Sequence, residues 1–599
     1  MRKEAPRSTR DADAPRWCFW VVGLSALVGL GLMLDALRRW SATYDEVAYL
    51  RVAARWWRTG DQEAITRMGS PLTFWKIQQV PVLWALDRIG LGDWIDDPEA
   101  HQAALLPLVR TWSLGIWLLA WILTATWGNR LYGPRAMAMA AALFALSPNL
   151  LAHGALVTME LPLVACTAGM FLLFWRFLRT GNRRCFWGTA ILGGLAWSCK
   201  FTTVLIPPIL GLAWWIAGQR RAASLPSPKG EGAGLPPPSG LANTLRVGRG
   251  MLAFLLVMVL SNWVLTGFAL MPLSQRAGAH PSLDGRFGPL LGRLVARAVE
   301  TPLPQDWVGF ATQVHHQRSG GPSYLWGEQR MTGWWYYYFV ALAVKVPLSF
   351  WLLVVGRIGL GRRVRSNGGD EIIPLALGVF LLAAALGSSR NYGIRYLLPL
   401  APLAIVWVSA LAEADRWARR LALIGLLGQG GAVAAIHPHE LSYFNRLAGG
   451  PAGGRHILAD SNLDWGQGAK WLARLQAHRP EFRDLTFYYF GDTDPGHYGV
   501  VGRRYVIRAG ADHPDLPPQL TAATSYLAVS ASLAWGPWGP PGYFRRLDAL
   551  RPIAWTEDGT IAIYRAADLH RLNTQAGVEW GTPARRRPGA PKMIQREPL

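Results

Sequence analysis

The chain has 599 residues, of which 51% are hydrophobic and 17% are charged. A soluble protein usually carries about 25% charged residues, so this composition, with its 31 tryptophans, indicates a polytopic membrane protein. The net charge of +23 does not predict nucleic-acid binding, because the basic residues are spread between apolar runs and form no single stripe. Membrane proteins instead collect Lys and Arg in their cytoplasmic loops.

Apolar runs that could cross a membrane recur along most of the chain, and a spanning helix needs roughly 20 residues. The first run follows a basic N-terminus without a small-residue cleavage site, so we expect a retained helix and not a signal peptide. The fifth and sixth runs are short and meet at Lys200, as in a tight helical pair. The predicted spans are 17–36, 104–126, 136–153, 160–177, 186–199, 202–217, 250–269, 336–355, 372–388, 395–411 and 420–436.

The basic residues predict how these spans are oriented. Alternate loops, beginning with the N-terminus, are rich in Arg and Lys, which places the N-terminus in the cytoplasm. The odd number of spans then places everything after residue 436 outside. A miscount by one span would reverse the pattern downstream of it.

The predicted domains follow from this topology. A basic cytoplasmic N-terminus (1–16) precedes the transmembrane domain (17–436), which contains two long outside loops (38–103 and 270–335). A cytoplasmic segment rich in Pro, Gly and Ser, within 220–248, is predicted to be a disordered linker.

The residues from 437 to 566 alternate short β-rich pieces with helical stretches such as Lys470–Gln476, which predicts a small extracytoplasmic α/β domain. The basic tail, 567–599, has few apolar residues and is predicted to be disordered. The strands are expected at Arg455–Ala459, Leu485–Phe490, Arg504–Ile507, Tyr526–Val529 and Ile561–Tyr564.

Two adjacent carboxylates, Asp45 and Glu46, follow the first span at the predicted membrane boundary. Thr43 and Glu46 have the spacing of a capping box, in which two side chains close the first turn of a helix. This structural role is an open alternative for Glu46, but it leaves Asp45 unexplained. A carboxylate in that position is a candidate general base.

Glu160 is the second candidate acid, at the start of the fourth predicted span. Its alternative role is that of an anion at a helix N-terminus. The topology places Glu160 and Asp45 on the same side of the membrane, which permits a single site. Cations in or near the spans on that face would suit a phosphate group, although pairing with carboxylates or helix-end carbonyls is an alternative for each of them. These cations are Arg110, Lys200, Lys345, Arg390 and Arg395.

Metal-binding patterns are weak in this sequence. His315 and His316 could bind phosphate, acceptor or metal, but a histidine pair in a loop more often does none of these. The four cysteines lack metal-ligand spacing, and we expect neither a disulfide framework nor a zinc site. No cofactor is predicted with certainty, and a requirement for a divalent metal is left open.

Several short motifs occur together, in an order that resembles one family. With them, about residues 17 to 566 resemble the protein O-mannosyltransferase and aminoarabinose-transferase superfamily, whose members are lipid-carrier-dependent glycosyltransferases of the GT-C fold. A stretch near residues 443–467 looks like a bacterial branch. The motifs are Asp45-Glu46, Ser70-Pro71-Leu72, Ser147-Pro148 with His153-Gly154, Thr158 and Glu160, Trp334–Tyr337 with Lys345-Val346-Pro347, Asn391–Pro399, Tyr443-Phe444-Asn445 with Gly449-Gly450-Pro451, and Asp460–Gln467.

The resemblance implies a polytopic α-helical GT-C protein of a bacterial plasma (inner) membrane. It implies a sugar donor on polyprenyl phosphate, an acceptor hydroxyl on a protein, lipid or glycan, and inverting transfer on the extracytoplasmic face. Asp45 matches the catalytic base of the family. Glu160 stands where many members have Asp, so it would orient the acceptor or the base.

One departure from the family concerns the donor phosphate. The aminoarabinose transferases have a phosphate-binding Lys before a Pro-Pro-Leu segment, whereas this chain has Met68-Gly69-Ser70 there. Phosphate binding is therefore assigned to other cations, first of all Lys200, Arg390 and Arg395. Further candidates for substrate contact are His153, His315 and Tyr392.

Two other classes of function fit the same pattern. A transporter or flippase for lipid-linked sugars would use the cations but would not need a base at Asp45. A non-catalytic membrane subunit would present its outer domain to partners. The sequence does not specify the sugar or the acceptor.

Overall fold

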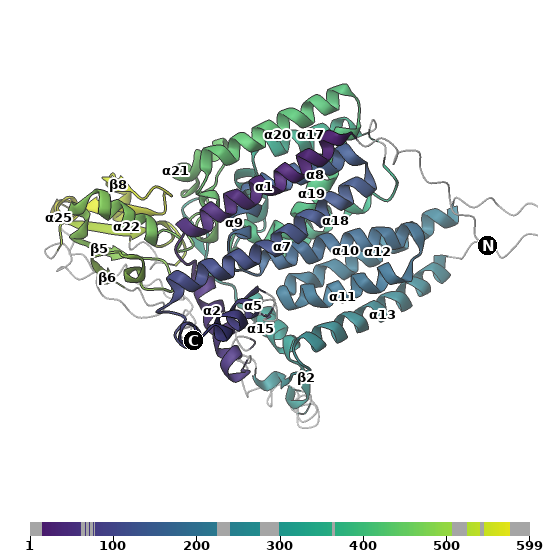
Figure 1. The fold of residues 1–599 in the computed structure, drawn as a ribbon, viewed down its shortest axis with the longest axis horizontal. Coiled ribbons are helices and arrows are strands. Elements are labelled where there is room, and N and C mark those ends of the chain that lie inside the picture. The colour runs from purple at the N-terminus through teal and green to yellow at the C-terminus, as the bar shows by residue number, and fades with distance from the viewer. Residues whose placement is uncertain are drawn as a thin grey trace, which may run out of the picture.

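The computed structural model describes residues 15–61, 78–223, 240–275, 299–361, 366–387, 389–505, 524–538 and 544–575, together with positions 66, 71, 76, 297 and 364. A bundle of long helices makes up most of the molecule, and a small α/β unit lies at one end of it (Figure 1). Several predicted features fall wholly or partly outside the described residues. They are most of the N-terminal segment, the Ser70-Pro71-Leu72 motif, parts of both outside loops, the centre of the linker, the end of the strand expected at Arg504–Ile507 and the end of the tail.

Each predicted span falls on a helix or on a group of consecutive helices. These segments are apolar, so they can lie in a bilayer. A segment in a bilayer must satisfy its backbone N–H and C=O groups internally, and a helix does so. The bundle consists of α1 (Arg16–Arg39), α7 (Gln102–Leu131), α8 (Pro134–Ala145), α9 (Pro148–Gly154), α10 (Glu160–Thr180), α11 (Arg183–Cys199), η1 (Phe201–Leu205), α12 (Ile206–Ala223), α13 (Gly240–Leu265), α16 (Tyr337–Lys345), α17 (Leu348–Gly359), α18 (Ile372–Gly387), η4 (Ile394–Leu400), α19 (Ala401–Ser409), η5 (Ala410–Glu413) and α20 (Arg416–Ile436).

Two of the predicted spans are bent helix pairs. The axes of α8 and α9 differ by 63°, and those of α16 and α17 by 108°. Pro148 begins α9 and Pro347 precedes α17, where proline cannot continue the backbone hydrogen bonds of the preceding helix. Among the described residues, six helical stretches are long and apolar enough to cross a membrane, or up to eight if each bent pair is one span. The chain is thus a mostly helical, multi-pass membrane protein, whereas the count of eleven spans is not confirmed.

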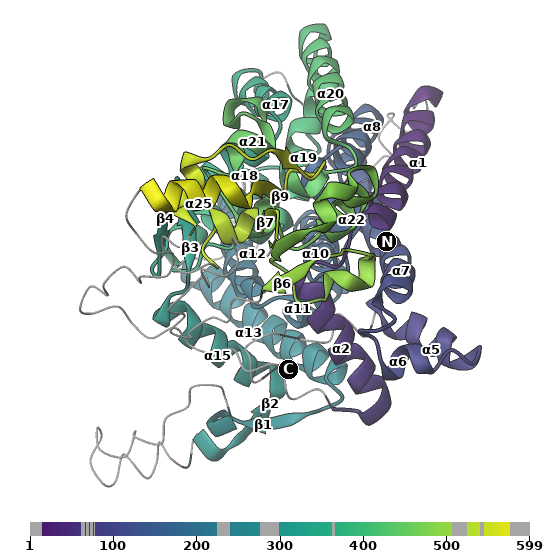
Figure 2. The same cartoon turned by 90° about the vertical axis from the view of Figure 1, so that its left-hand side faces the viewer.

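The two loops predicted to lie outside the membrane contain structure of their own. The first includes α2 (Tyr44–Thr59), α5 (Val80–Arg88) and α6 (Asp93–Asp96). The second includes α15 (Gln305–Ser319), η2 (Leu273–Gln275) and two short antiparallel pairs. Figure 2 shows α2 and α15 at the same end of the bundle as the α/β unit. The pairs are β1 (Leu270–Pro272) with β2 (Pro302–Pro304), and β3 (Ser323–Leu325) with β4 (Glu328–Arg330).

The α/β unit is built on a five-stranded sheet of order β6-β5-β7-β9-β8. The central strand β7 pairs in parallel with β5 and antiparallel with β9. Leu472 of the helix α22 (Ala469–His478) packs with Phe487 and Ile563 of the sheet. The strands are β5 (Leu485–Tyr488), β6 (Arg503–Tyr505), β7 (Tyr526–Ser530), β8 (Ala554–Trp555) and β9 (Ile561–Arg565). The short helices are η6 (Glu440–Ser442), η7 (Arg446–Ala448), α21 (Gly450–Gly454), η8 (Asp460–Asn462), η9 (Pro480–Arg483), η10 (Pro495–Tyr498), α24 (Ala531–Ala534), η11 (Arg545–Ala549) and α25 (Ala566–Gln575).

Three local predictions are wrong. The expected strand at Arg455–Ala459 is absent, and these residues form a turn after α21 and the approach to η8. Residues 220–223 belong to α12 and residues 240–248 to α13, so both ends of the predicted disordered linker are helical. The start of the predicted disordered tail is the helix α25, which packs Leu569 into the core beside the sheet.

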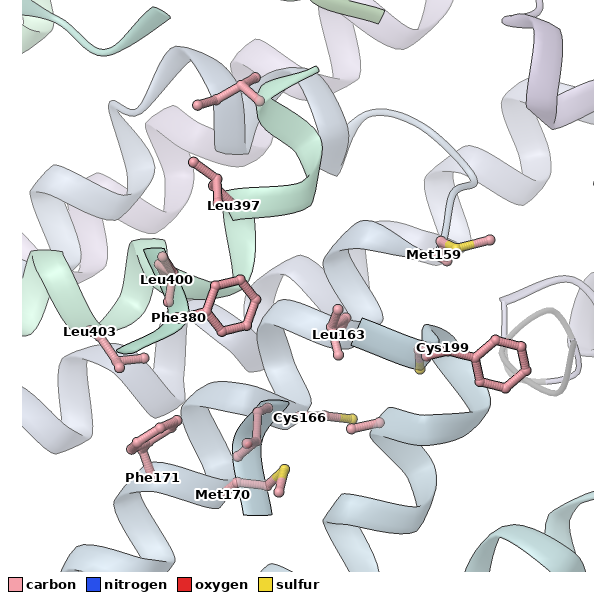
Figure 3. Close-up of a cluster of buried hydrophobic side chains, with 14 of the residues drawn as sticks. Met159, Leu163, Cys166, Met170, Phe171, Cys199, Phe380, Leu397, Leu400 and Leu403 are labelled. Carbon is pink, nitrogen blue, oxygen red and sulfur yellow. The ribbon is translucent and has the colours of Figure 1, made fainter. Parts of the chain in front are cut away.

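The apolar core of the bundle lies between α10, the segment η4–α19 and α11. Figure 3 shows Leu163 and Met170 of α10, Leu397 and Leu403 of η4–α19, and Cys199 of α11 in one cluster. All five side chains are buried. This packing supports the segment at the start of η4, which carries Arg395.

Helices α11 and α13 approach each other closely at a glycine. A Cβ atom on Gly194 would lie 2.5 Å from the carbonyl oxygen of Met258 and within contact of Ser261 Oγ. We expect Gly194→Ala to destabilise the protein by on the order of 1–3 kcal/mol, because the clash includes backbone that cannot move freely. Thermal unfolding of the detergent-solubilised protein measures this effect.

The matched control is Gly115→Ala in the middle of α7, where a Cβ atom would meet nothing within 4 Å. Alanine is the better helix former by about 1 kcal/mol, so this variant should be as stable as the wild type or more so. Equal unfolding temperatures for the two variants would contradict the close packing at Gly194.

Candidate functional site

The N-terminus of α2 is held by a capping box. Thr43 is the N-cap, and its backbone N–H donates a hydrogen bond of 3.0 Å to Glu46 Oε2. The capping box predicted from the sequence is therefore confirmed. Because neighbouring side chains on a helix point in different directions, fixing Glu46 inward also fixes the direction of Asp45.

Glu46 is also half of a buried ion pair with Arg110 of α7. Arg110 Nη2 lies 2.6 Å from Glu46 Oε2, and both side chains are inaccessible to solvent. Burial alone would raise the pKa of Glu46, but Arg110 and the backbone N–H groups of Thr43 and Val157 lower it below its ordinary value. Glu46 is accordingly an ionised structural carboxylate.

All five N–H groups of Arg110 are used within the protein. Two hydrogen bonds go to Glu46, and three go to the carbonyl oxygens of Leu37, Trp40 and Ser41 at the end of α1. Arg110 thus joins α7, α2 and the end of α1. This arrangement leaves no donor for the phosphate contact that the sequence suggested for Arg110.

Asp45 and Glu160 converge on one guanidinium group. Arg395 Nη1 is 2.8 Å from Asp45 Oδ2 and 4.0 Å from Glu160 Oε1. The two acids belong to α2 and α10, and Arg395 lies in η4. The side chain of Asp45 is 23% exposed whereas that of Glu160 is 1% exposed, so Asp45 is the accessible member of the pair.

Lys200 completes this group of charges. Its Nζ lies 3.1 Å from Glu160 Oε1 and 3.7 Å from the ring centroid of Tyr396. Glu160 begins α10, as predicted, and Lys200 caps the end of α11. Asp45, Glu160, Lys200 and Arg395 therefore form one cluster, which we call the Arg395 cluster.

A segment of the α/β unit, residues 460–467, packs against the Arg395 cluster. Ser461 Oγ donates a hydrogen bond of 2.7 Å to the carbonyl oxygen of Tyr392, which also accepts one from Arg395 Nε. Trp465 lies under the guanidinium group of Arg395, 4.3 Å from its ring centroid to Cζ. The carbonyl oxygen of Trp465 accepts a hydrogen bond of 2.8 Å from the N–H of Tyr44, next to Asp45.

The remaining predicted site residues occupy different places. Lys345 is buried and donates hydrogen bonds to the carbonyl oxygens of Leu441 and Asn462, at 3.0 and 2.6 Å. It therefore joins the backbone of the 460–467 segment to that of Leu441. His153 is buried with its ring 6.0 Å from that of Trp465, at the edge of the Arg395 cluster. Tyr392 contributes its carbonyl oxygen, as described above.

Two predicted residues make contacts with α15 or with the residue that follows it. Arg390 Nε donates to the carbonyl oxygen of Gly320, 2.7 Å away. His315 lies on α15 beside His316, with ring centroids 6.3 Å apart. No group of three or more His, Cys, Asp or Glu side chains among the described residues could hold a metal ion.

Three residues near the cluster were not predicted as site residues. Tyr396 and Trp465 contact the two cations through their rings, and Asp460 is buried close enough for the charges of Arg395 and Asp45 to affect its pKa. Asp460 and Trp465 belong to a motif noticed in the sequence. The signal in the sequence was the resemblance of this motif to the bacterial branch of the family, and it assigned no role to either residue.

The arrangement suits chemistry on an anionic substrate. It combines an accessible carboxylate with two cations, and a second carboxylate that holds both cations in place. Such a site can accept a proton at Asp45 and stabilise negative charge that develops on a nearby oxygen. Fold and site together define a multi-pass membrane protein with a cluster of charged groups where its helix bundle meets the α/β unit.

Comparison with known proteins agrees with this class. Residues 107–234, from α7 to the segment after α12, match the family described as dolichyl-phosphate-mannose-protein mannosyltransferase. The match confirms, for this segment, the resemblance to the protein O-mannosyltransferase superfamily. No curated protein matches the chain significantly.

Two solved structures are among those similar to this chain. ArnT from Cupriavidus metallidurans, bound to undecaprenyl phosphate, has 12% sequence identity and a TM-score of 0.45, over 92% of this chain and 98% of that one. The archaeal oligosaccharyltransferase AglB from Archaeoglobus fulgidus, in complex with an inhibitory peptide and a dolichol-phosphate, has 14% identity and a TM-score of 0.38, over 92% of this chain and 74% of that one.

The buried pair of Glu46 and Arg110 should be essential for stability. Arg110→Met removes one partner and leaves an uncompensated carboxylate, so we expect a loss of about 3–5 kcal/mol. The double variant Glu46→Gln, Arg110→Met should recover part of this loss, because it removes the buried charge. Thermal unfolding in detergent compares the three proteins.

The exposed pair of Arg330 and Glu328 serves as the control. Arg330→Met should cost less than about 1 kcal/mol, because solvent screens an exposed ion pair. If Arg110→Met lowered the free energy of unfolding by no more than Arg330→Met does, the buried pair would not be essential for stability.

Proposed function

We propose that the chain is a membrane glycosyltransferase that transfers a sugar from a polyprenyl-phosphate donor to an acceptor hydroxyl. The observation that carries this proposal is the convergence of Asp45, Glu160 and Lys200 on Arg395. The family match over residues 107–234 supports it, because that family is described by a lipid-phosphate sugar donor and by glycosyl transfer. We also propose that the site lies on the extracytoplasmic face, with the N-terminus in the cytoplasm, because the basic residues of alternate loops favour this orientation.

Asp45 is the general base in this mechanism. The acceptor hydroxyl is a weak nucleophile, so a carboxylate takes its proton as its oxygen attacks the anomeric carbon. The bond from the anomeric carbon to the phosphate oxygen breaks as the new bond forms on the opposite face, which inverts the anomeric centre. The polyprenyl phosphate leaves as an anion and needs no general acid.

Arg395 and Lys200 stabilise the leaving phosphate. Arg395 uses Nη1 for Asp45 and Nε for the carbonyl oxygen of Tyr392, and Nη2 donates no hydrogen bond within the described chain. Its Nη2 therefore has two N–H groups that can face phosphate oxygens. Glu160 holds Lys200 and Arg395 side by side and so acts as a positioning residue.

The direct test is Asp45→Asn. We expect transfer to fall by about 10²–10⁴-fold, because the amide cannot accept the proton, while binding of the donor is retained. Purified protein and a labelled polyprenyl-phosphate sugar provide the assay. The control is Asp93→Asn on the exposed surface of α6, which should keep full activity.

Full activity in Asp45→Asn would contradict the proposal. Movement of the labelled lipid from one leaflet of a vesicle membrane to the other, without product formation, would instead identify a transporter. A wild-type protein that neither transfers nor transports the sugar would fit a non-catalytic subunit.

Lys200 should act mainly on the donor. We expect Lys200→Gln to raise the KM for the donor by about tenfold or more, because a charged hydrogen bond to phosphate is lost. Lys470→Gln is the control, since Lys470 Nζ donates to the carbonyl oxygen of Arg38 and lies 5.5 Å from the ring centroid of Tyr498, outside the Arg395 cluster. An unchanged donor KM in Lys200→Gln would remove Lys200 from the phosphate site.

A further inference from the structure

Asp460 combines three unusual properties. It is a non-glycine residue with φ of 59°, its exposed fraction is only 5%, and its Oδ2 atom has no hydrogen-bond partner within the described chain. An unpaired buried carboxylate oxygen is costly, and strained residues of this kind gather at functional sites. These features indicate that a ligand completes the environment of Asp460.

The backbone holds Asp460 beside the Arg395 cluster. Its N–H donates a hydrogen bond of 3.1 Å to Ser532 Oγ, and the next residue, Ser461, is bonded to the carbonyl oxygen of Tyr392. Burial raises the pKa of Asp460 to about 6, the positive charge of Arg395 lowers it, and the charge of Asp45 raises it. At neutral pH the carboxyl group of Asp460 is therefore mainly ionised, and it lies near Arg395 and Asp45.

A buried indole N–H faces this carboxylate. Trp538 Nε1 is close enough to Asp460 for a hydrogen bond from the indole to lower the pKa of Asp460, although the contact falls short of full hydrogen-bond geometry in the described part of the chain. The indole N–H and the carboxylate oxygen are thus neighbours, one a donor and the other an acceptor. A hydroxyl group, which both donates and accepts, matches this pair.

Aromatic rings pack against the indole of Trp538. The ring centroid of Trp538 lies 6.0 Å from that of Phe490, with an interplanar angle of 19°, and 5.7 Å from that of Tyr392. Phe490 in turn stacks on Tyr44, the residue before Asp45, at 5.5 Å. An apolar aromatic wall with a few fixed polar groups is the usual lining of a small-molecule site. It suits a sugar ring, which has apolar C–H faces and a polar edge of hydroxyl groups.

We propose that Asp460 and Trp538 form a subsite that binds a hydroxyl group of the donor's glycosyl ring. This inference rests on the proposed function. The donor is favoured over the acceptor because Asp460 neighbours Arg395, and the glycosyl group is attached directly to the phosphate that Arg395 binds. The α/β unit would then select the sugar, while the helix bundle supplies the base and the cations.

The test compares a lipid with and without its sugar. The full-length protein is titrated in detergent with undecaprenyl phosphate and with a panel of undecaprenyl-phosphate hexoses and pentoses. Asp460→Asn is the main variant, because asparagine tolerates a positive φ and keeps the shape of the side chain. Trp538→Phe keeps an aromatic side chain and removes the indole N–H donor.

We expect both variants to bind the preferred sugar-bearing lipid at least about tenfold more weakly and undecaprenyl phosphate as well as the wild type does. Glu557→Gln, on the exposed surface of the same unit, is the control and should bind both lipids normally. Equal losses for both lipids, or no loss, would overturn the proposal. Unchanged donor binding with a raised KM for the acceptor would also overturn it, by assigning the subsite to the acceptor.

The result also separates this proposal from the proposed function. If the wild type binds undecaprenyl phosphate but no attached sugar changes its affinity, the subsite alone is wrong. If the wild type binds no polyprenyl phosphate at all, the proposed function fails and the subsite with it.

Discussion

The position of Asp45 depends on the buried ion pair between Glu46 and Arg110. A charge removed from water must be paired, so the first turn of α2 is held where Glu46 meets Arg110 and the capping Thr43. Arg110 extends this restraint to the end of α1 through three backbone carbonyl oxygens. The adjacent carboxylate of Asp45 is thereby directed toward Arg395. One of the two neighbouring acids is structural, and it holds the other beside Arg395.

The Arg395 cluster is assembled from segments far apart in the chain. Asp45 comes from α2, Glu160 from α10 and Lys200 from the end of α11. Asp45 forms an ion pair with Arg395, and Glu160 forms one with Lys200. Behind them, the 460–467 segment binds both the backbone that carries Arg395 and the N-terminus of α2. The α/β unit is thus joined to the Arg395 cluster by hydrogen bonds.

Sequence reasoning was most successful where the relevant interaction is local. The capping box depends on residues three apart, and the start of α10 at Glu160 depends on a short apolar pattern. It failed at the strand expected for 455–459, where contacts with distant segments override a weak β pattern. It also could not separate Arg395 from Arg390, because both are cations near the same predicted span. Only their partners show that Arg395 faces the acids, whereas Arg390 donates to the carbonyl oxygen of Gly320.

The amino-acid sequence by itself determined the multi-pass helical character of the chain, the positions of the helices and the candidacy of Asp45 and Glu160. These features follow from hydrophobicity and from short-range spacing, which are properties of neighbouring residues. Only the tertiary structure decided which cation joins the two acids, that Glu46 is structural, and that Asp460 lies at the site with an unpaired oxygen. Each of these depends on which distant residue supplies the opposite charge or hydrogen bond, and spacing along the chain does not encode that.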